Sequence, residues 1–128
     1  MTTINRLCPR LVVDDADRAI RFYTQALGAK ELQRYADERG KIVHSELALG
    51  DHVLMVKDAD GVDPSPRRLG GTPVILSLEV AGADALAERM LELGAEVIFP
   101  VADREYGKRD GRLRDPYGHL WIVSEPLP

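Results

Sequence analysis

The chain has 128 residues, a length typical of one domain that can fold without a disulfide or a metal. Hydrophobic residues make up 45% and charged residues 30%, and the formal net charge of -4 argues against a general binder of nucleic acids or anionic membranes. The single cysteine, Cys8, excludes an internal disulfide, and no apolar run reaches the roughly 20 residues of a membrane span. We therefore expect a soluble, cytoplasmic protein with no nucleic-acid partner and no membrane partner.

The first half of the chain predicts a strand, a helix and three further strands. Residues 6–13 read as a strand that ends at a double aspartate. Apolar residues then recur at helical spacing up to Leu27, which predicts an amphipathic helix that is capped by Asp14 or Asp15 and ended by Gly28. The three strands, joined by tight turns, are expected at residues 30–35, 42–49 and 52–56.

The second half repeats this order after a long loop. Residues 58–72 are rich in Asp, Pro and Gly and have no apolar period, so they predict a loop that either covers a binding site or only links two halves. A strand, a helix and three strands are expected at residues 74–80, 84–93, 96–101, 106–114 and 120–125. Between the last two strands, Asp115 to Gly118 predict a β-turn in which the Asp115 carboxylate caps the turn.

The two halves also share a short sequence. Leu27-Gly28-Ala29 and Leu93-Gly94-Ala95 end the two expected helices and lie 66 positions apart. Such a repeat indicates two copies of one supersecondary unit that bury their apolar faces by packing. The predicted fold class is therefore α+β, as one domain over residues 1–128 with two tandem βαβββ modules, 1–57 and 73–128, and a linker loop at 58–72.

Three motifs carry a family resemblance. They are the Asp-Asp-x-x-Arg-Ala-Ile-Arg-Phe-Tyr helix start at residues 14–23, the Leu27-Gly28 helix exit, and the Asp-Pro-Tyr-Gly-His turn at residues 115–119. With the two modules, they resemble the glyoxalase, bleomycin-resistance and extradiol-dioxygenase superfamily, also called vicinal oxygen chelate proteins. The resemblance implies a curved mixed sheet around a cavity, helices on its outer face, and a homodimer.

The resemblance also implies where metal ligands would lie. In metalloenzymes of this superfamily, His, Gln and Glu ligands come from the first and last strands of each module, and these positions fall here at Cys8, Met55, Val74 and Ile122. One thiol and one thioether do not replace imidazole and carboxylate donors. A shift of one residue gives no better set, so we expect no metal and no other cofactor.

Other reactive groups have weak support in the sequence. His44 and Glu46 share one face of an expected strand, where they form either two metal ligands or an exposed polar surface. Cys8 has no sequence-local partner that would activate it. No nucleophile-elbow motif and no phosphate-binding glycine loop occur. We therefore assign no catalytic residue.

Strand alternation and a group of arginines predict the binding residues. Trp121 is expected to face the helix layer, while its neighbours face the cavity. Arg10, Arg109, Arg112 and Arg114 either anchor a planar or acidic ligand or pair with surface carboxylates. The candidate ligand-binding residues are Cys8, Arg10, His44, Glu46, Met55, Leu76, Tyr106, Arg109, Arg112, Leu120, Ile122 and Ser124.

These features favour a metal-free protein that binds a small molecule. It would sequester an aromatic or amphipathic antibiotic, for drug resistance or self-protection, without breaking a bond. The alternative is a glyoxalase-like lyase, isomerase or dioxygenase with a displaced or unusual site. A third hypothesis is a regulatory or scaffolding module.

Overall fold

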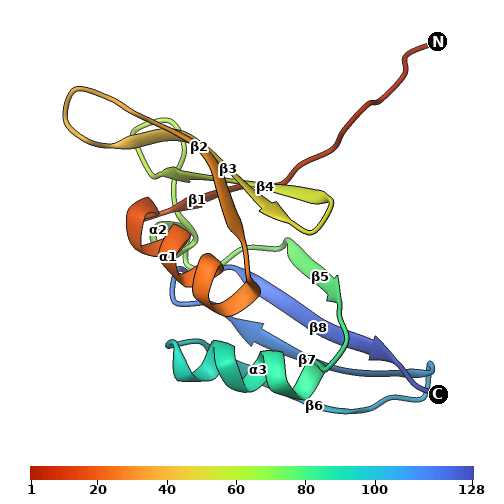
Figure 1. Ribbon diagram of the computed structural model, residues 1–128. Coiled ribbons are helices and arrows are strands. Elements are labelled where there is room, and N and C mark those ends of the chain that lie inside the picture. The colour runs from red at the N-terminus through yellow and green to blue at the C-terminus, as the bar shows by residue number, and fades with distance from the viewer. The chain divides into compact units, whose positions relative to one another are not determined.

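The computed structural model describes residues 1–128, which divide into two compact units, Met1–Asp63 and Pro64–Pro128. Each unit holds one four-stranded sheet in which the first strand is parallel to the last and the other neighbours are antiparallel (Figure 1). This is the predicted α+β fold with two βαβββ modules. None of the helices has the length and hydrophobicity to cross a lipid bilayer.

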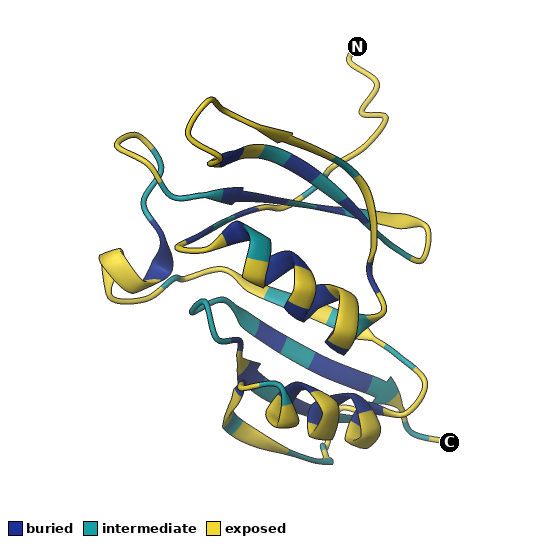
Figure 2. Ribbon diagram, turned by 60° about the vertical axis from the view of Figure 1, so that its left-hand side comes forward, coloured by how far each residue is buried: buried dark blue, intermediate teal, exposed yellow.

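The first unit has its strands in the order β1-β4-β3-β2. Its elements are β1 (Arg10–Val13), α1 (Ala16–Leu27), β2 (Lys30–Ala36), β3 (Ile42–Leu49) and β4 (His52–Asp58). Side chains of α1 pack on one face of this sheet, where Ile20, Tyr23, Leu47, Leu54 and Val56 are buried. Buried and exposed residues alternate along α1 in Figure 2, as expected for a helix with one face on a sheet.

The ends of α1 follow from two residues. The Asp15 carboxylate accepts a hydrogen bond from the Arg18 amide at 3.1 Å, which satisfies one of the unpaired amides at the helix start. Gly28 adopts a left-handed conformation with φ of 69° and ends the helix. Both predicted helix boundaries are confirmed.

The first strand is shorter than predicted. It begins at Arg10 rather than at residue 6, because Pro9 has no amide hydrogen to donate to a neighbouring strand. The Pro9 carbonyl still accepts a hydrogen bond from the Met55 amide at 2.9 Å. The residues before Pro9 extend away from the sheet (Figure 1).

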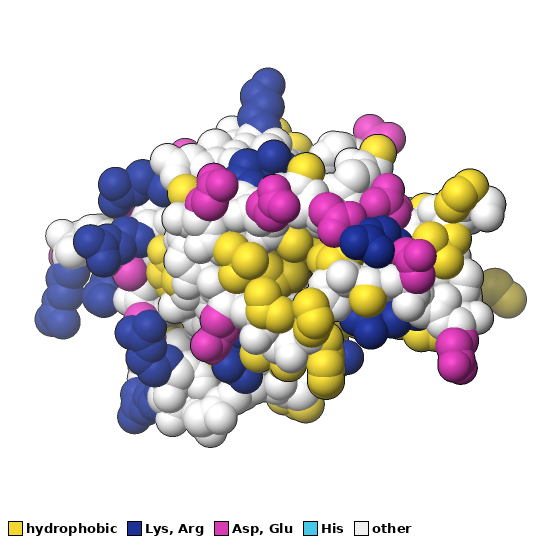
Figure 3. All heavy atoms as spheres, turned by 90° about the horizontal axis from the view of Figure 1, so that it is seen from below, with side chains coloured by type: hydrophobic (Ala, Val, Ile, Leu, Met, Phe, Trp, Pro, Cys, Tyr) yellow, Lys and Arg dark blue, Asp and Glu magenta, His cyan; other side chains and the backbone are white.

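The second unit has the same topology, with strand order β5-β8-β7-β6. Its elements are α2 (Pro66–Leu69), β5 (Ile75–Glu79), α3 (Ala83–Glu92), β6 (Glu96–Asp103), β7 (Lys108–Arg114) and β8 (Leu120–Pro126). The core lies between α3 and the sheet and includes Leu86, Met90, Leu113, Trp121 and Val123. In Figure 3, seen from the side of α3 and β6, hydrophobic side chains gather near the centre beside charged side chains of both signs.

The stretch expected as a loop contains one turn of helix. The Ser65 hydroxyl accepts a hydrogen bond from the Arg68 amide at 3.3 Å, Pro66 occupies the first helical turn, and Gly70 ends it with φ of 81°. These are ordinary start and stop signals of a helix. Four residues are too few to show an apolar period, so the sequence pattern did not reveal α2.

Candidate functional site

The register of the second sheet decides which side chains face away from α3. Arg112 pairs with Ile122, and Ile122 pairs with Ser77, so these side chains form one row on one face. We call this face, which α3 does not cover, the open face of the unit. Trp121 and Val123 are buried on the opposite face, against α3. The predicted orientation of Trp121 is therefore confirmed.

A hollow of about 260 Å³ lies on the open face of the second unit. Its lining residues are Phe99, Arg104, Tyr106, Asp110, Gly111, Arg112 and Ile122. Two arginines and one aspartate give the lining a net charge of +1, while Phe99 and Ile122 supply apolar surface. An apolar wall with a few polar groups is the usual composition of a small-molecule site.

Asp110 links two polar side chains that line this hollow, Tyr106 and Arg104. Its carboxylate accepts hydrogen bonds from the Tyr106 hydroxyl at 2.6 Å and from Arg104 Nε at 2.9 Å. Arg104 Nη2 also donates to the backbone carbonyls of Pro100 and Asp110, at 2.6 and 3.0 Å. The hydrogen bond to Asp110 raises the pKa of Tyr106, because ionisation would place a phenolate beside a carboxylate. Tyr106 thus remains a neutral hydroxyl over the physiological range.

Arg112 is held differently. Its guanidinium carbon lies over the ring of Phe99, 5.4 Å from the centroid, and makes a cation–π contact. Its Nε is buried and has no hydrogen-bond partner. No carboxylate pairs with Arg112, whereas Arg104, which lines the same hollow, pairs with Asp110. Arg112 is therefore the side chain of this hollow with unused donors.

Gly111 sets the position of Phe99. A Cβ atom at Gly111 would lie 2.8 Å from Val101 Cγ2 and 2.9 Å from the Phe99 carbonyl oxygen. The β6–β7 register shifts at this point, between Phe99 opposite Arg112 and Ala102 opposite Asp110. The missing side chain at Gly111 lets the bulged backbone of β6 approach β7 closely.

The first unit has an equivalent row on its own open face. By register, Gln33 pairs with Glu46, Glu46 with Met55, and Met55 with Arg10. Glu46 thus occupies, on β3 of the first unit, the place that Arg112 occupies on β7 of the second. The two modules carry opposite charges at the same position of the same sheet.

Glu46 is the centre of a polar cluster on that row. Its carboxylate lies 3.0 Å from His44 Nε2 and accepts hydrogen bonds from Gln33 Nε2 at 2.5 Å and Arg6 Nη1 at 3.3 Å. The hydrogen bond with His44, together with the charge of Arg6, lowers the pKa of Glu46. Glu46 is therefore an ionised acceptor at neutral pH.

The positions at which the resemblance places metal ligands do not fit a metal. Met55 offers a thioether, and Ile122 offers no donor at all. The register replaces Val74 by Ile75, which pairs with Leu120 on the open face, and this hydrocarbon is no better as a ligand. The structure contains no group of three or more His, Cys, Asp or Glu side chains that could hold a metal ion.

Several of the predicted binding residues come together in the second unit. Tyr106, Arg112 and Ile122 line the hollow, and Leu120 lies on the same open face. Ser124 also lies on this face, but it is only 3% exposed, and its hydroxyl donates to a backbone carbonyl of β5 at 3.0 Å. The hydroxyl of Ser124 therefore serves the fold.

Other predicted residues gather in the first unit. Arg10, His44, Glu46 and Met55 share its open face by register. Arg10 donates to a backbone carbonyl of β3 at 2.9 Å. Cys8, a half-buried free thiol, precedes β1 instead of lying within it. That these residues contact a ligand stays a prediction.

Two of the predicted positions are wrong. Leu76 pairs with Trp121 and therefore faces α3. Arg109 also lies on the α3 side, where its guanidinium pairs with Asp84 at 2.7 Å and Asp103 at 3.0 Å. Both errors concern the face of a strand, which reverses with a shift of one residue.

Four residues that line the hollow are absent from the predicted binding residues: Phe99, Arg104, Asp110 and Gly111. The one available signal was Phe99, an aromatic residue on a strand predicted beside the arginine-rich strand. Phe99 remains 53% exposed in the structure, which is unusual for a side chain that only fills a core.

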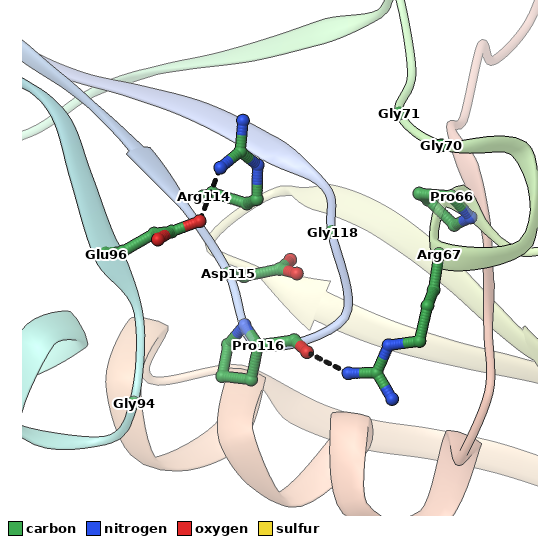
Figure 4. A pocket seen from close by; sticks show the side chains of 10 residues that line it. All are labelled: Pro66, Arg67, Gly70, Gly71, Gly94, Glu96, Arg114, Asp115, Pro116 and Gly118. Atoms are coloured by element: carbon green, nitrogen blue, oxygen red, sulfur yellow. Dashed lines mark hydrogen bonds and ion pairs between the residues drawn. The ribbon is translucent and has the colours of Figure 1, made fainter.

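A larger hollow, of about 410 Å³, lies in the same unit beside the Asp115 turn (Figure 4). Four of its lining residues are glycines, and its charged groups already have partners. Arg114 pairs with Glu96, and Arg67 donates to the Pro116 carbonyl at 3.3 Å. This hollow offers few free donors, so we assign the candidate site to the open face.

A family model and a sequence relative each match nearly the whole chain. A family model described as the Glyoxalase/Bleomycin resistance protein/Dioxygenase superfamily matches residues 3–123. An uncharacterized protein of Mycobacterium bovis, Mb0911c, is 40% identical over 126 residues, which span 94% of this chain and 83% of the relative. The matched region therefore includes almost all of both modules.

Solved structures with the same fold cover both units. TioX from Micromonospora sp. ML1 has a TM-score of 0.74 and 25% identity, covering 96% of this chain and 99% of its own. PA1353 from Pseudomonas aeruginosa has a TM-score of 0.76 and 25% identity, with coverages of 96% and 98%. FosX, a genomically encoded fosfomycin resistance protein of Listeria monocytogenes, has a TM-score of 0.76 at 18% identity, with coverages of 98% and 96%, which shows the fold alone. With the family model matched over residues 3–123, this chain belongs to the glyoxalase/bleomycin resistance protein/dioxygenase superfamily.

Proposed function

We propose that this chain is a metal-free small-molecule-binding protein that sequesters an aromatic or amphipathic compound, such as an antibiotic. The observation that carries the proposal is the chemistry of the open-face rows. The superfamily resemblance places metal-ligand positions at Met55 and Ile122, and Ile122 lines a hollow. A hydrocarbon at this position favours contact with an apolar ligand over coordination of a cation.

The polar groups of the hollow also suit binding better than bond breaking. The raised pKa of Tyr106 keeps its hydroxyl protonated at neutral pH, so this residue is not available as a general base, and its proton is already donated to Asp110. Asp110 already accepts from two side chains, so it has little capacity to take a proton from a ligand. These hydrogen bonds fix the side chains around Arg112, whose guanidinium has donors that a bound compound would contact.

Metal analysis combined with thermal unfolding tests this function. The purified protein is analysed for Ni, Zn, Mn and Fe and then melted in the presence of polyaromatic drugs. A ligand that binds only the folded state at 100 times its Kd stabilises that state by about 2.7 kcal/mol, which raises the Tm by several degrees. We expect such a shift without stoichiometric metal, and the compound should be recovered chemically unchanged.

Two results would contradict this proposed function. Stoichiometric metal held by native side chains would contradict a metal-free protein, and conversion of the compound during incubation would show an enzyme. We also propose that the protein is a homodimer in the cytoplasm, in line with the superfamily resemblance. Light scattering on the purified protein measures the mass and would reject the dimer if it returned about 14.2 kDa, the mass of one chain.

A further inference from the structure

We infer that the compound bound in the open-face hollow of the second unit is an aromatic carboxylate whose acidic group pairs with Arg112. This inference rests on the proposed function and names the class of its ligand. The aromatic part lies against Ile122 and Phe99, and the carboxylate completes the hydrogen bonding of the guanidinium.

The first argument is the distribution of ion pairs in the second sheet. The other arginines of β7 and of the hairpin before it each have a carboxylate partner: Arg104 pairs with Asp110, Arg109 with Asp84, and Arg114 with Glu96. Arg112 makes no ion pair, and its buried Nε has no hydrogen-bond partner. A buried donor without an acceptor is costly, so an acceptor supplied from outside gains more here than at an exposed arginine.

The carboxylate nearest in sequence cannot fill this gap. Asp110 lies two positions before Arg112 on the same face of β7, but its two oxygens accept from Tyr106 and Arg104. If the Asp110 carboxylate turned toward Arg112, the Tyr106 hydroxyl and Arg104 Nε would lose the acceptor that they share. The hollow therefore keeps a net positive charge that an anion can neutralise.

The second argument is the orientation of Arg112. Phe99 covers one face of its guanidinium at 5.4 Å, which leaves the donors in the plane of the group available. Two of these donors match the two oxygens of a carboxylate, a geometry that an ammonium group does not offer. Ile122 is the direct neighbour of Arg112 across the strands, so apolar surface begins beside the charge.

Paired probes that differ only in charge test the inference. The full-length protein is titrated with 1-naphthoate and with its neutral analogue 1-naphthamide, and backbone NMR shifts report the Kd and the location of binding. We expect 1-naphthoate to bind roughly tenfold more tightly, the factor that one charge-assisted hydrogen bond supplies. The largest shifts should fall on residues 99, 110 to 112 and 122.

Three variants separate the charge from the fold. Arg112→Gln should reduce 1-naphthoate binding to the level of 1-naphthamide and leave 1-naphthamide binding unchanged. Arg112→Lys keeps the charge but loses the planar pair of donors, so an intermediate affinity is expected. Arg109→Gln, on the same strand but on the α3 side, is the matched control and should keep the preference for the acid.

Each outcome has a distinct meaning. Equal Kd values for the two probes on the unaltered protein, or a preference that survives in Arg112→Gln, would overturn the carboxylate inference while leaving small-molecule binding intact. Shifts that cluster in the first unit would also overturn it. Failure of both probes and of all polyaromatic drugs, together with bound metal, would reject the proposed function itself.

Discussion

Replacement of Asp115 by alanine tests how the turn before β8 is held. The Asp115 carboxylate is 3% exposed and accepts hydrogen bonds from the Tyr117 amide at 2.9 Å and the His119 amide at 3.0 Å. Its second oxygen accepts from Trp121 Nε1 at 2.8 Å, in the core of the second unit. One carboxylate thus joins the turn to the largest buried side chain.

The expected cost follows from these three donors. Trp121 is 1% exposed, so its indole nitrogen cannot reach water, and losing its acceptor costs about 1–3 kcal/mol. The two turn amides belong to half-buried residues and can be partly rehydrated, at about 1 kcal/mol each. Asp115→Ala should therefore lower the free energy of unfolding by about 3–5 kcal/mol, a large part of the roughly 5–15 kcal/mol of a typical domain.

Urea unfolding followed by circular dichroism measures this change. Fluorescence of Trp121, the single tryptophan of the chain, gives a second probe in the variants that keep it. Asp115→Ala, Trp121→Phe and the double variant form a cycle, in which a coupling energy of about 1–3 kcal/mol is expected between the two side chains. Asp51→Ala, in the exposed turn between β3 and β4, is the control and should change stability by less than about 0.5 kcal/mol. A loss below about 1 kcal/mol for Asp115→Ala, or additive effects in the cycle, would refute this account of the turn.

Three further predictions concern other parts of the molecule. Gly111→Ala should cost about 1–3 kcal/mol in urea unfolding, because the new methyl group overlaps the β6 bulge. Gly61→Ala, where no atom lies within 4 Å, should leave stability nearly unchanged, and equal effects of the two substitutions would contradict the overlap. Phe99→Leu should weaken 1-naphthoate binding by roughly 2–5-fold in the NMR titration, since an exposed cation–π contact contributes about 0.5–1 kcal/mol; an unchanged Kd would remove Phe99 from the site. Hydrogen bonds from Arg34 and Arg21 hold the pKa of Asp17 below its ordinary value of 3.8, so the stability they contribute is present above that pH and is lost as the pH falls through the lower folded pKa. Arg34→Gln should therefore make acid unfolding, followed by circular dichroism, less steep below about pH 4, and an unaltered acid profile would show that this pair contributes nothing.

The elements that sequence predicted well are those with strong local signals. The amphipathic pattern, the Asp15 cap and the left-handed Gly28 define α1 within a dozen residues. The turn at Asp115 also formed as predicted, with the Gly118 amide donating to the Asp115 carbonyl at 3.1 Å. Such features depend on neighbours along the chain, so one sequence is enough to find them.

The face of each strand was harder to predict, because it depends on the spacing of the two modules. The helix exits are offset by 66 positions, but the register pairs Arg10 with Met55 and Ser77 with Ile122, an offset of 67 for both strands. One residue reverses the orientation of every side chain in a strand, which is why Leu76 was assigned to the wrong face. The alternation within β5, where Leu76 and Leu78 alternate with Ser77 and Glu79, is the local signal that favours the α3 side for Leu76.

The hollow itself depends on contacts between distant residues. A register shift within β6, between Val97 and Phe99, brings Phe99 opposite Arg112, and a bulge cannot be located from strand alternation alone. Arg104 reaches Asp110 from the hairpin between β6 and β7. The sequence therefore indicated the arginine-rich strand but could not tell which arginine would remain without a partner.

The exchange of Glu46 for Arg112 at equivalent places has an evolutionary consequence. Both side chains lie on a sheet face that points away from the helix of its own module, so reversing the charge there leaves the packed interior of each module intact. The two copies could therefore diverge in what they recognise while they kept the same scaffold. In a fold built from two like modules, the charge of one open face can change while the other open face keeps its own.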